Sequence, residues 1–121
     1  MDAHVLQGVV LAVELANEPP RDSPLRAAFL AEDVDAFAAA INPLLETPRV
    51  VAGTLEPART PLGLAAFGLA SLVAERGLER LGQCAADDCT AVYADTSAKG
   101  SRRYCSRTCS TRQNVRRHRG V

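Results

Sequence analysis

Four cysteines are gathered in the last third of the chain, in two close pairs. Their spacing is Cys84-x4-Cys89-x15-Cys105-x3-Cys109. Each pair can place two sulfur atoms about 2.3 Å from one metal ion while the segment between the pairs folds back. Four thiolates around one ion are typical of a structural Zn²⁺ site. We therefore expect Cys84, Cys89, Cys105 and Cys109 to bind one Zn²⁺ ion.

Reversible disulfide formation is the alternative chemistry for paired cysteines. Neither pair has the Cys-x-x-Cys spacing of a thioredoxin-type site, so metal binding is favoured. The residues near Met1 do not resemble a secretory signal, and no run approaches the roughly 20 apolar residues of a membrane span. These features predict a cytoplasmic protein, and structural disulfides are rare in that compartment.

Charge is divided unevenly along the chain, although the formal net charge is zero. Residues 1–83 carry 6 arginines against 11 acidic residues, a net charge of −5, whereas residues 84–121 carry 8 basic residues against 3 acidic ones, a net charge of +5. A basic terminal module of this kind favours a polyanionic partner, and we expect double-stranded DNA. The predicted nucleic-acid contacts are Lys99, Arg102, Arg103, Arg107, Arg112, Arg116, Arg117 and Arg119.

Three of these arginines share one face of a predicted terminal helix. Arg112, Arg116 and Arg119 are spaced i, i+4 and i+7. Like charges at this spacing repel each other, so we expect the stripe to point outward and an anionic partner to offset the repulsion. Two alternatives remain open. Some arginines would instead neutralise the metal site, since four thiolates and one Zn²⁺ carry a local charge near −2, or the tail would simply be solvated.

The elements before the cysteines are predicted to be helices separated by prolines. They run from residue 3 to 17, from a cap at Asp22 or Ser23 to Leu30, from a cap at Asp33 to Ile41, and from Thr60 to Leu81. Residues 43–60 carry three prolines and one glycine, and their pattern does not distinguish a short helix from a strand or a loop.

Between the cysteine pairs we expect a β-hairpin, with one strand at residues 91–94, a turn at 96–100 and a return strand at 102–104. Ser106 is the predicted cap of a terminal helix that begins between Cys105 and Cys109. The predicted fold is therefore mainly α. An alanine-rich helical domain (residues 1–83) precedes a small treble-clef-like four-cysteine zinc finger (residues 84–121) made of a β-hairpin and a C-terminal helix.

The run from Cys84 to Arg119 resembles the CGNR zinc finger of bacterial transcription regulators. The resemblance rests on CAADDC at residues 84–89, YADTS at 93–97 and RRYCS at 102–106. Where the family has Cys-Gly-Asn-Arg, this chain has Cys109-Ser110-Thr111-Arg112, which keeps the cysteine and the arginine. Upstream, LAVELAN at residues 11–17 resembles the opening of the ABATE domain, the alanine-rich helical region of stress-induced transcription regulators, here in a shortened form.

These features together predict a zinc-dependent DNA-binding protein, a bacterial transcription regulator whose arginine-rich C-terminal helix contacts DNA. The alternative is a zinc-finger adaptor that binds RNA or an acidic protein surface. In either case the helical domain is a candidate for homodimer formation. Enzymatic activity is not expected, because the sequence offers no catalytic constellation and four cysteine ligands leave no open position for water.

Overall fold

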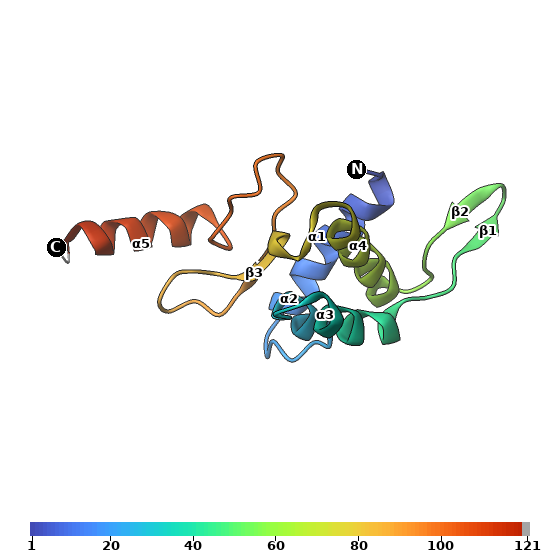
Figure 1. Cartoon of the computed structure of the whole chain (residues 1–121), viewed down its shortest axis with the longest axis horizontal. Coiled ribbons are helices and arrows are strands. Elements are labelled where there is room, and N and C mark those ends of the chain that lie inside the picture. Colours follow the sequence, from blue (N-terminus) through green and yellow to red (C-terminus); the bar gives the residue numbers. More distant parts are fainter. Residues whose placement is uncertain (120–121) are drawn as a thin grey trace.

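Helices from the first part of the chain form the body of the molecule (Figure 1). In this computed structural model, residues 1–119 are described, so the last two residues of the predicted finger, 120 and 121, lie outside the described residues. The body comprises α1 (Ala3–Asn17), α2 (Leu25–Phe29), α3 (Val34–Ile41), the 3-10 helix η1 (Asn42–Leu44) and α4 (Pro61–Arg76). The chain thus combines helices with two small hairpins, which are described below.

Two of the predicted helix caps are confirmed. The Asp33 carboxylate accepts a hydrogen bond from the backbone N–H of Ala36 at 2.7 Å, and the Thr60 hydroxyl accepts one from Gly63 at 3.0 Å. Each bond satisfies a backbone donor that has no partner within its own helix. The Thr60 cap is itself held by Glu46, whose carboxylate accepts hydrogen bonds from the Thr60 hydroxyl at 2.6 Å and from the backbone N–H of Arg59 at 2.9 Å.

The predicted continuation of the last helix to Leu81 is wrong. Helix α4 ends at Arg76, because Gly77 adopts a positive φ of 102° that favours glycine and breaks the helical path. The 3-10 helix η2 (Leu78–Arg80) follows, and Leu81 begins strand β3 (Leu81–Gln83). The apolar spacing of Leu78 and Leu81 therefore reflects packing against the same core from two different elements.

Helices α1 and α4 pack against each other along much of their length and hold the centre of the core. Their backbones approach closely where Gly8 meets Gly68, since a methyl group added at Gly68 would lie 2.5 Å from the backbone nitrogen of Val9. Around this contact the core is filled mainly by alanine and leucine side chains. Its largest fully buried side chains are Leu25, Ile41, Leu69, Leu72 and Val92.

Residues 43–60, for which the sequence favoured no single element, contain η1 and an antiparallel hairpin. Strands β1 (Arg49–Val51) and β2 (Thr54–Glu56) form this hairpin, which projects from the body (Figure 1). Val50 and Leu55 are opposite each other in the register and are 71% and 61% exposed. The β1–β2 hairpin therefore exposes two apolar side chains to solvent.

The second hairpin corrects the predicted strand pairing. A strand is present at β4 (Val92–Ala94), close to the predicted residues 91–94, but it pairs antiparallel with β3, upstream of the cysteines. No return strand forms at residues 102–104. Leu81, Val92 and Ala94 from this hairpin are buried in the same core as α1 and α4, so the core extends across the predicted boundary at residue 83.

Helix α5 (Arg107–Arg119) extends away from the body, on the side opposite the β1–β2 hairpin (Figure 1). Only Cys109 and Gln113 of this helix are buried. Across residues 1–119, no helix is long and apolar enough to span a bilayer. The cytoplasmic location stays a prediction.

Candidate metal centre

The β3–β4 hairpin and the start of α5 bring the four cysteines together. Cys84 follows β3 directly, and its backbone N–H donates to the Ala91 carbonyl at 2.8 Å, which closes the connection between the strands into a knuckle. Cys89 lies within that knuckle, where its N–H donates to the Ala86 carbonyl at 3.2 Å. Cys105 precedes α5 and Cys109 lies in its first turn.

The predicted cap of the terminal helix is confirmed. The Ser106 hydroxyl accepts a hydrogen bond from the backbone N–H of Cys109 at 3.2 Å, and the Ser106 carbonyl accepts one from Ser110 at 3.2 Å. The cap therefore fixes where α5 begins and which way the Cys109 side chain points. As a result Cys105 and Cys109 face the knuckle.

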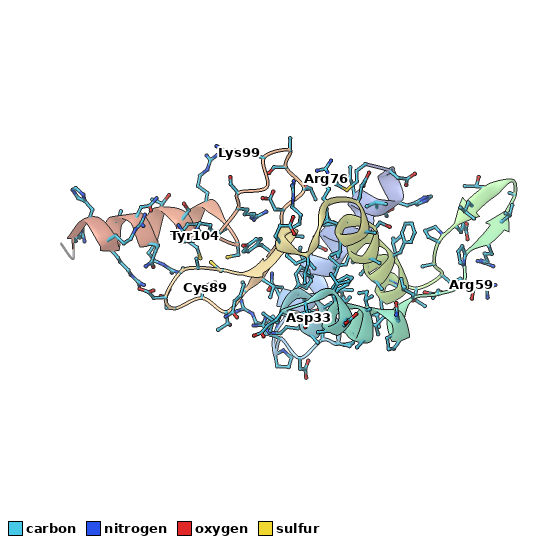
Figure 2. All side chains as sticks on the ribbon, viewed as in Figure 1. Asp33, Arg59, Arg76, Cys89, Lys99 and Tyr104 are labelled. Atoms are coloured by element: carbon cyan, nitrogen blue, oxygen red, sulfur yellow. The ribbon has the colours of Figure 1, made fainter. Side chains whose placement is uncertain are left out.

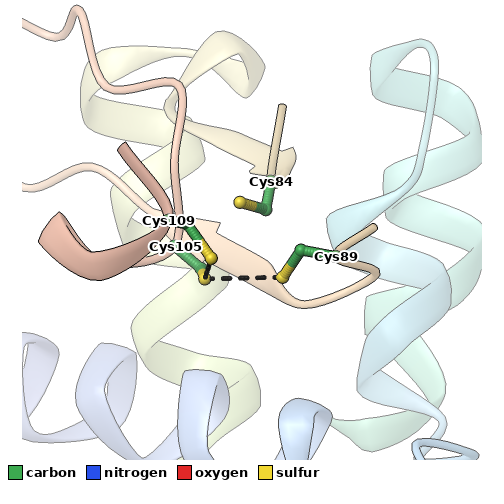
Figure 3. Close-up of side chains that lie close together, drawn as sticks. All are labelled: Cys84, Cys89, Cys105 and Cys109. Carbon is green, nitrogen blue, oxygen red and sulfur yellow. Dashed lines mark hydrogen bonds between the residues drawn. The ribbon is translucent and has the colours of Figure 1, made fainter. Parts of the chain in front are cut away.

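The four sulfur atoms have the spacing of a tetrahedral metal site (Figure 3). All four lie within 4.8 Å of one another, with Cys89 Sγ 3.7 Å and Cys109 Sγ 3.6 Å from Cys105 Sγ. Four sulfurs bonded at about 2.3 Å to one tetrahedral ion would be about 3.8 Å apart. The arrangement thus fits a four-coordinate metal ion without a change of fold.

The pKa values of two of these clustered thiols are shifted in opposite directions. Burial opposes ionisation of Cys84, but hydrogen bonds from the backbone N–H groups of Cys105 and Ala86 and from neighbouring thiols outweigh it and lower its pKa to about 7. Burial and the hydrogen bond donated to Cys109 raise the pKa of Cys105 to about 12. Opposite shifts are expected when close groups share protons. A divalent cation would replace those protons and stabilise all four thiolates.

Comparison with models of known protein families agrees with these features. Residues 80–120 match the CGNR zinc finger family model. The match begins at Arg80, so it includes both strands of the β3–β4 hairpin as well as the cysteines and α5. A search of curated proteins found no match. The likeness of residues 1–83 to an ABATE domain and the division of the chain at residue 83 both stay predictions.

Two acidic residues of the segment that matches the family model hold α5 against the knuckle. The Asp88 carboxylate forms ion pairs with Arg112 at 2.9 Å and with Arg116 at 3.1 Å, although all three side chains remain partly exposed. A guanidinium nitrogen of Arg112 also lies 3.5 Å from Cys109 Sγ. Asp87 and Gln113 exchange two hydrogen bonds, of 3.3 and 3.1 Å. Arg112 is therefore placed to offset the negative charge of the thiolates.

Asp95 organises the loop between β4 and α5. Its carboxylate accepts hydrogen bonds from the backbone N–H of Ser97 at 2.9 Å, the Ser97 hydroxyl at 2.6 Å and the backbone N–H of Arg102 at 2.9 Å. Burial opposes ionisation of this carboxyl, but the hydrogen bonds from Ser97 and Arg102 outweigh it and lower its pKa. Asp95 thus serves the loop, whereas the metal cluster consists of the four cysteines.

Replacement of Asp95 by alanine is expected to lower the free energy of unfolding by about 2 kcal/mol, since backbone donors of the loop lose a charged acceptor. Metal content should be unchanged. In the parent, this stabilisation should be complete at neutral pH and should decline as the pH falls through the carboxyl range, because the pKa of Asp95 is lower in the folded protein. Chemical denaturation at several pH values measures both effects. Thr96→Ala is the control, and loss of the metal from Asp95→Ala would contradict this role.

The eight predicted nucleic-acid contacts fall into two groups. Four side chains have polar partners within the finger. Arg112 and Arg116 pair with Asp88, Arg117 donates to the Asn114 amide oxygen at 2.8 Å, and Arg102 donates to the carbonyls of Tyr104, at 2.8 Å, and Cys105. Across residues 1–119, the side chains of Lys99, Arg103, Arg107 and Arg119 form no ion pair and no hydrogen bond to another side chain or to backbone. Lys99 projects from the loop between β4 and α5 (Figure 2).

The outward stripe predicted for Arg112, Arg116 and Arg119 is therefore only partly outward. The first two side chains bend toward Asp88. In the sequence, Asp87 and Asp88 contribute to the net charge of residues 84–121, and no partner is predicted for either of them. Their position as the only acidic pair inside a basic module is the signal that points to such a role.

The sequence does not reveal the residues that attach the helical body to the segment that carries the cysteines. The Asn17 side chain exchanges two hydrogen bonds with the backbone of Val92, of 2.8 and 2.9 Å. Arg21 donates to the Thr90 hydroxyl at 2.8 Å, and Arg76 donates to the Thr96 carbonyl at 2.8 Å. Arg80 donates to the carbonyls of Asp95 and Ser97. These contacts join residues far apart in the sequence, and local patterns do not reveal them.

Proposed function

We propose that the four cysteines bind one Zn²⁺ ion that holds a treble-clef-like arrangement of knuckle, hairpin and helix. The support is the tetrahedral spacing of four sulfur atoms together with the CGNR family match. With four thiolate ligands the ion would have no open position for a substrate, so its contribution would be to structure. Metal analysis of protein purified under reducing conditions should give one Zn²⁺ per chain.

We further propose that this finger binds double-stranded DNA and that the protein is a transcription regulator. The observation that carries the proposal is an exposed basic helix, α5, which extends from the body and is anchored at its first turn by the cysteine cluster. It ends in Arg116, Arg117, His118 and Arg119, and the helix itself contains no acidic residue. Arginine-rich helices of this kind can contact DNA phosphates and base edges.

A salt-resolved titration tests the DNA proposal. The zinc-loaded chain should bind a short mixed-sequence duplex, and log K should fall linearly with log salt, by about 0.9 per phosphate contact. Removal of the metal with a chelator should abolish binding, because α5 loses its anchor, and added zinc should restore it. Absence of duplex binding at low salt would refute the proposal.

Asp88→Asn is expected to strengthen duplex binding and to steepen its salt dependence. The substitution removes one negative charge and releases Arg112 and Arg116 from their ion pairs. The hydrogen bond from Arg116 is the main cause of a lowered Asp88 pKa, so the carboxylate is ionised at neutral pH and competes with phosphate for both arginines. Asp87→Asn is a matched control, since it has the same charge change beside Gln113. Equal binding by the two variants would show that the ion pairs do not restrain the arginines.

An adaptor that binds proteins remains the second candidate, and the β1–β2 hairpin is the observation that favours it. Exposed apolar side chains such as Val50 and Leu55 are typical of contacts between proteins. The homodimer through the helical domain also stays a prediction, which the mass of the protein in solution would test. Binding of a protein partner that persists at high salt, without duplex binding, would favour the adaptor, because apolar contacts are not screened by salt.

A further inference from the structure

The finger contains a hollow that is lined by arginine and serine side chains at the start of α5. It has a volume of about 410 Å³ and lies between residues 101–104 and the first turn of α5. Three arginines, Arg102, Arg103 and Arg107, line it together with the hydroxyl-bearing side chains of Ser101, Ser106 and Ser110. The Arg102 guanidinium donates to the carbonyls of Tyr104 and Cys105, which leaves the side chains of Arg103 and Arg107 without polar partners among residues 1–119. Cationic forks and hydroxyl groups are the donors that bind phosphate oxygens in proteins.

The charge of this hollow is not balanced within the part of the chain that the structure describes. Neither Arg103 nor Arg107 has a carboxylate within 4.0 Å among residues 1–119. Arg112 and Arg116, in contrast, share Asp88. Two unpaired guanidinium groups that line one concave surface repel each other, and an anion bound between them would relieve that repulsion.

The backbone of both arginines is held by contacts close to the cysteine cluster. The Arg103 carbonyl accepts a hydrogen bond from the backbone N–H of Ala85 in the knuckle at 2.8 Å. The Arg103 guanidinium lies 6.0 Å from the centre of the Tyr104 ring. Arg107 is the first residue of α5 and directly follows the Ser106 cap. Metal binding at the cysteines would therefore fix the backbone from which both side chains reach into the hollow.

A second hollow adjoins the first and favours an extended anion over a single small one. It has a volume of about 490 Å³ and is lined by Arg107, Thr108, Thr111 and Arg112. Arg107 belongs to both hollows. A DNA strand that runs along the first turns of α5 could therefore place neighbouring phosphates on either side of the Arg107 guanidinium.

We propose that these two adjoining hollows, with Arg103 and Arg107 as principal ligands, bind consecutive phosphates of one DNA strand. The inference rests on the proposed DNA-binding function and assigns its backbone contact to the start of α5, beside the metal cluster. In this arrangement the contact at Arg103 and Arg107 fixes the position of the finger on the duplex. The far part of α5, with Arg117 and Arg119, is then left to extend along or into a groove.

The test compares Arg103→Gln, Arg107→Gln and the double variant with Arg59→Gln, all as zinc-loaded full chains. Arg59→Gln is the matched control, because it removes the same charge from an exposed arginine of the helical body outside both hollows. Titrations use a short mixed-sequence DNA duplex at several salt concentrations. Arg103→Gln and Arg107→Gln should each weaken binding about tenfold at low salt and flatten the slope of log K against log salt by about 0.9. Zinc content and helical signal should stay at the parent values.

The outcomes separate this proposal from the function on which it rests. Failure of the parent chain to bind the duplex would overturn both. Parental binding and slope for the Arg103 and Arg107 variants would overturn the phosphate site while leaving the DNA-binding function standing. An equal loss in Arg59→Gln would also overturn it, because the effect would then follow net charge rather than the hollows.

Discussion

Cys109→Ala is expected to abolish metal binding and to release α5 from the knuckle. A structural Zn²⁺ site of this kind contributes about 10–16 kcal/mol of apparent binding energy at neutral pH, and loss of one of four ligands removes most of it. Without the metal, helix α5 would depend on its polar contacts to Asp87 and Asp88, since only Cys109 and Gln113 are buried in its 13 residues. Isolated helices shorter than about 12–15 residues are marginal in water, so the helix should melt.

Metal analysis and far-UV circular dichroism measure this effect, and the lost helical signal should correspond to α5 alone. Thr108→Ala is the control, because Thr108 is the exposed neighbour of Cys109. Retention of both stoichiometric zinc and full helicity in Cys109→Ala would contradict the four-cysteine site. Retention of helicity without zinc would instead show that the contacts to Asp87 and Asp88 are enough to hold α5.

Asn17→Ala is expected to lower the free energy of unfolding of the whole protein by about 2–4 kcal/mol, because two backbone groups of Val92 lose their partners. Val92 is fully buried, and the Asn17 amide satisfies its N–H and its carbonyl together. The same amide connects α1 to β4, next to the knuckle. The variant should therefore weaken the finger as well as the body, with a single unfolding transition at lower temperature and a faster loss of zinc to a chelator.

Gln7→Ala provides the control for this prediction, since Gln7 lies on the exposed face of the same helix and alanine suits a helix equally well. Thermal and chemical denaturation of the zinc-loaded proteins give the comparison. Asn17→Ala could instead split the unfolding transition into two, one for the body and one for the finger. In that case the two parts would unfold independently, and the core that they share would not couple their stabilities.

The parts of this structure that depend on local chemistry could be predicted from the sequence. Asp33, Thr60 and Ser106 cap helices as expected, because a cap requires only a short polar side chain and a backbone donor two or three residues away. The cysteine cluster could also be predicted from the sequence. Four ligands of one type with this spacing leave few ways to surround an ion.

The parts that depend on distant partners could not be predicted. Strand β4 was expected to pair with the residues that follow it, whereas it pairs with β3, because a two-residue alternation marks a strand without naming its partner. Leu81 fits a helical spacing in the sequence, but the positive φ of Gly77 ends the helix before Leu81 is reached. The ion pairs of Asp88 with Arg112 and Arg116 join residues 24 and 28 positions apart, and only the folded knuckle brings them together.

The β1–β2 hairpin has features that restrict its pairing with strands of other molecules. An exposed hairpin with apolar side chains offers unpaired edges to another molecule, which is how many proteins begin to aggregate. Here each strand has three residues, Pro48 precedes β1 and Pro57 follows β2. Proline has no N–H to donate, so an added strand cannot continue its ladder past the open end of the hairpin. Any edge-to-edge pairing would therefore span three residues at most and would stop short of a fibril.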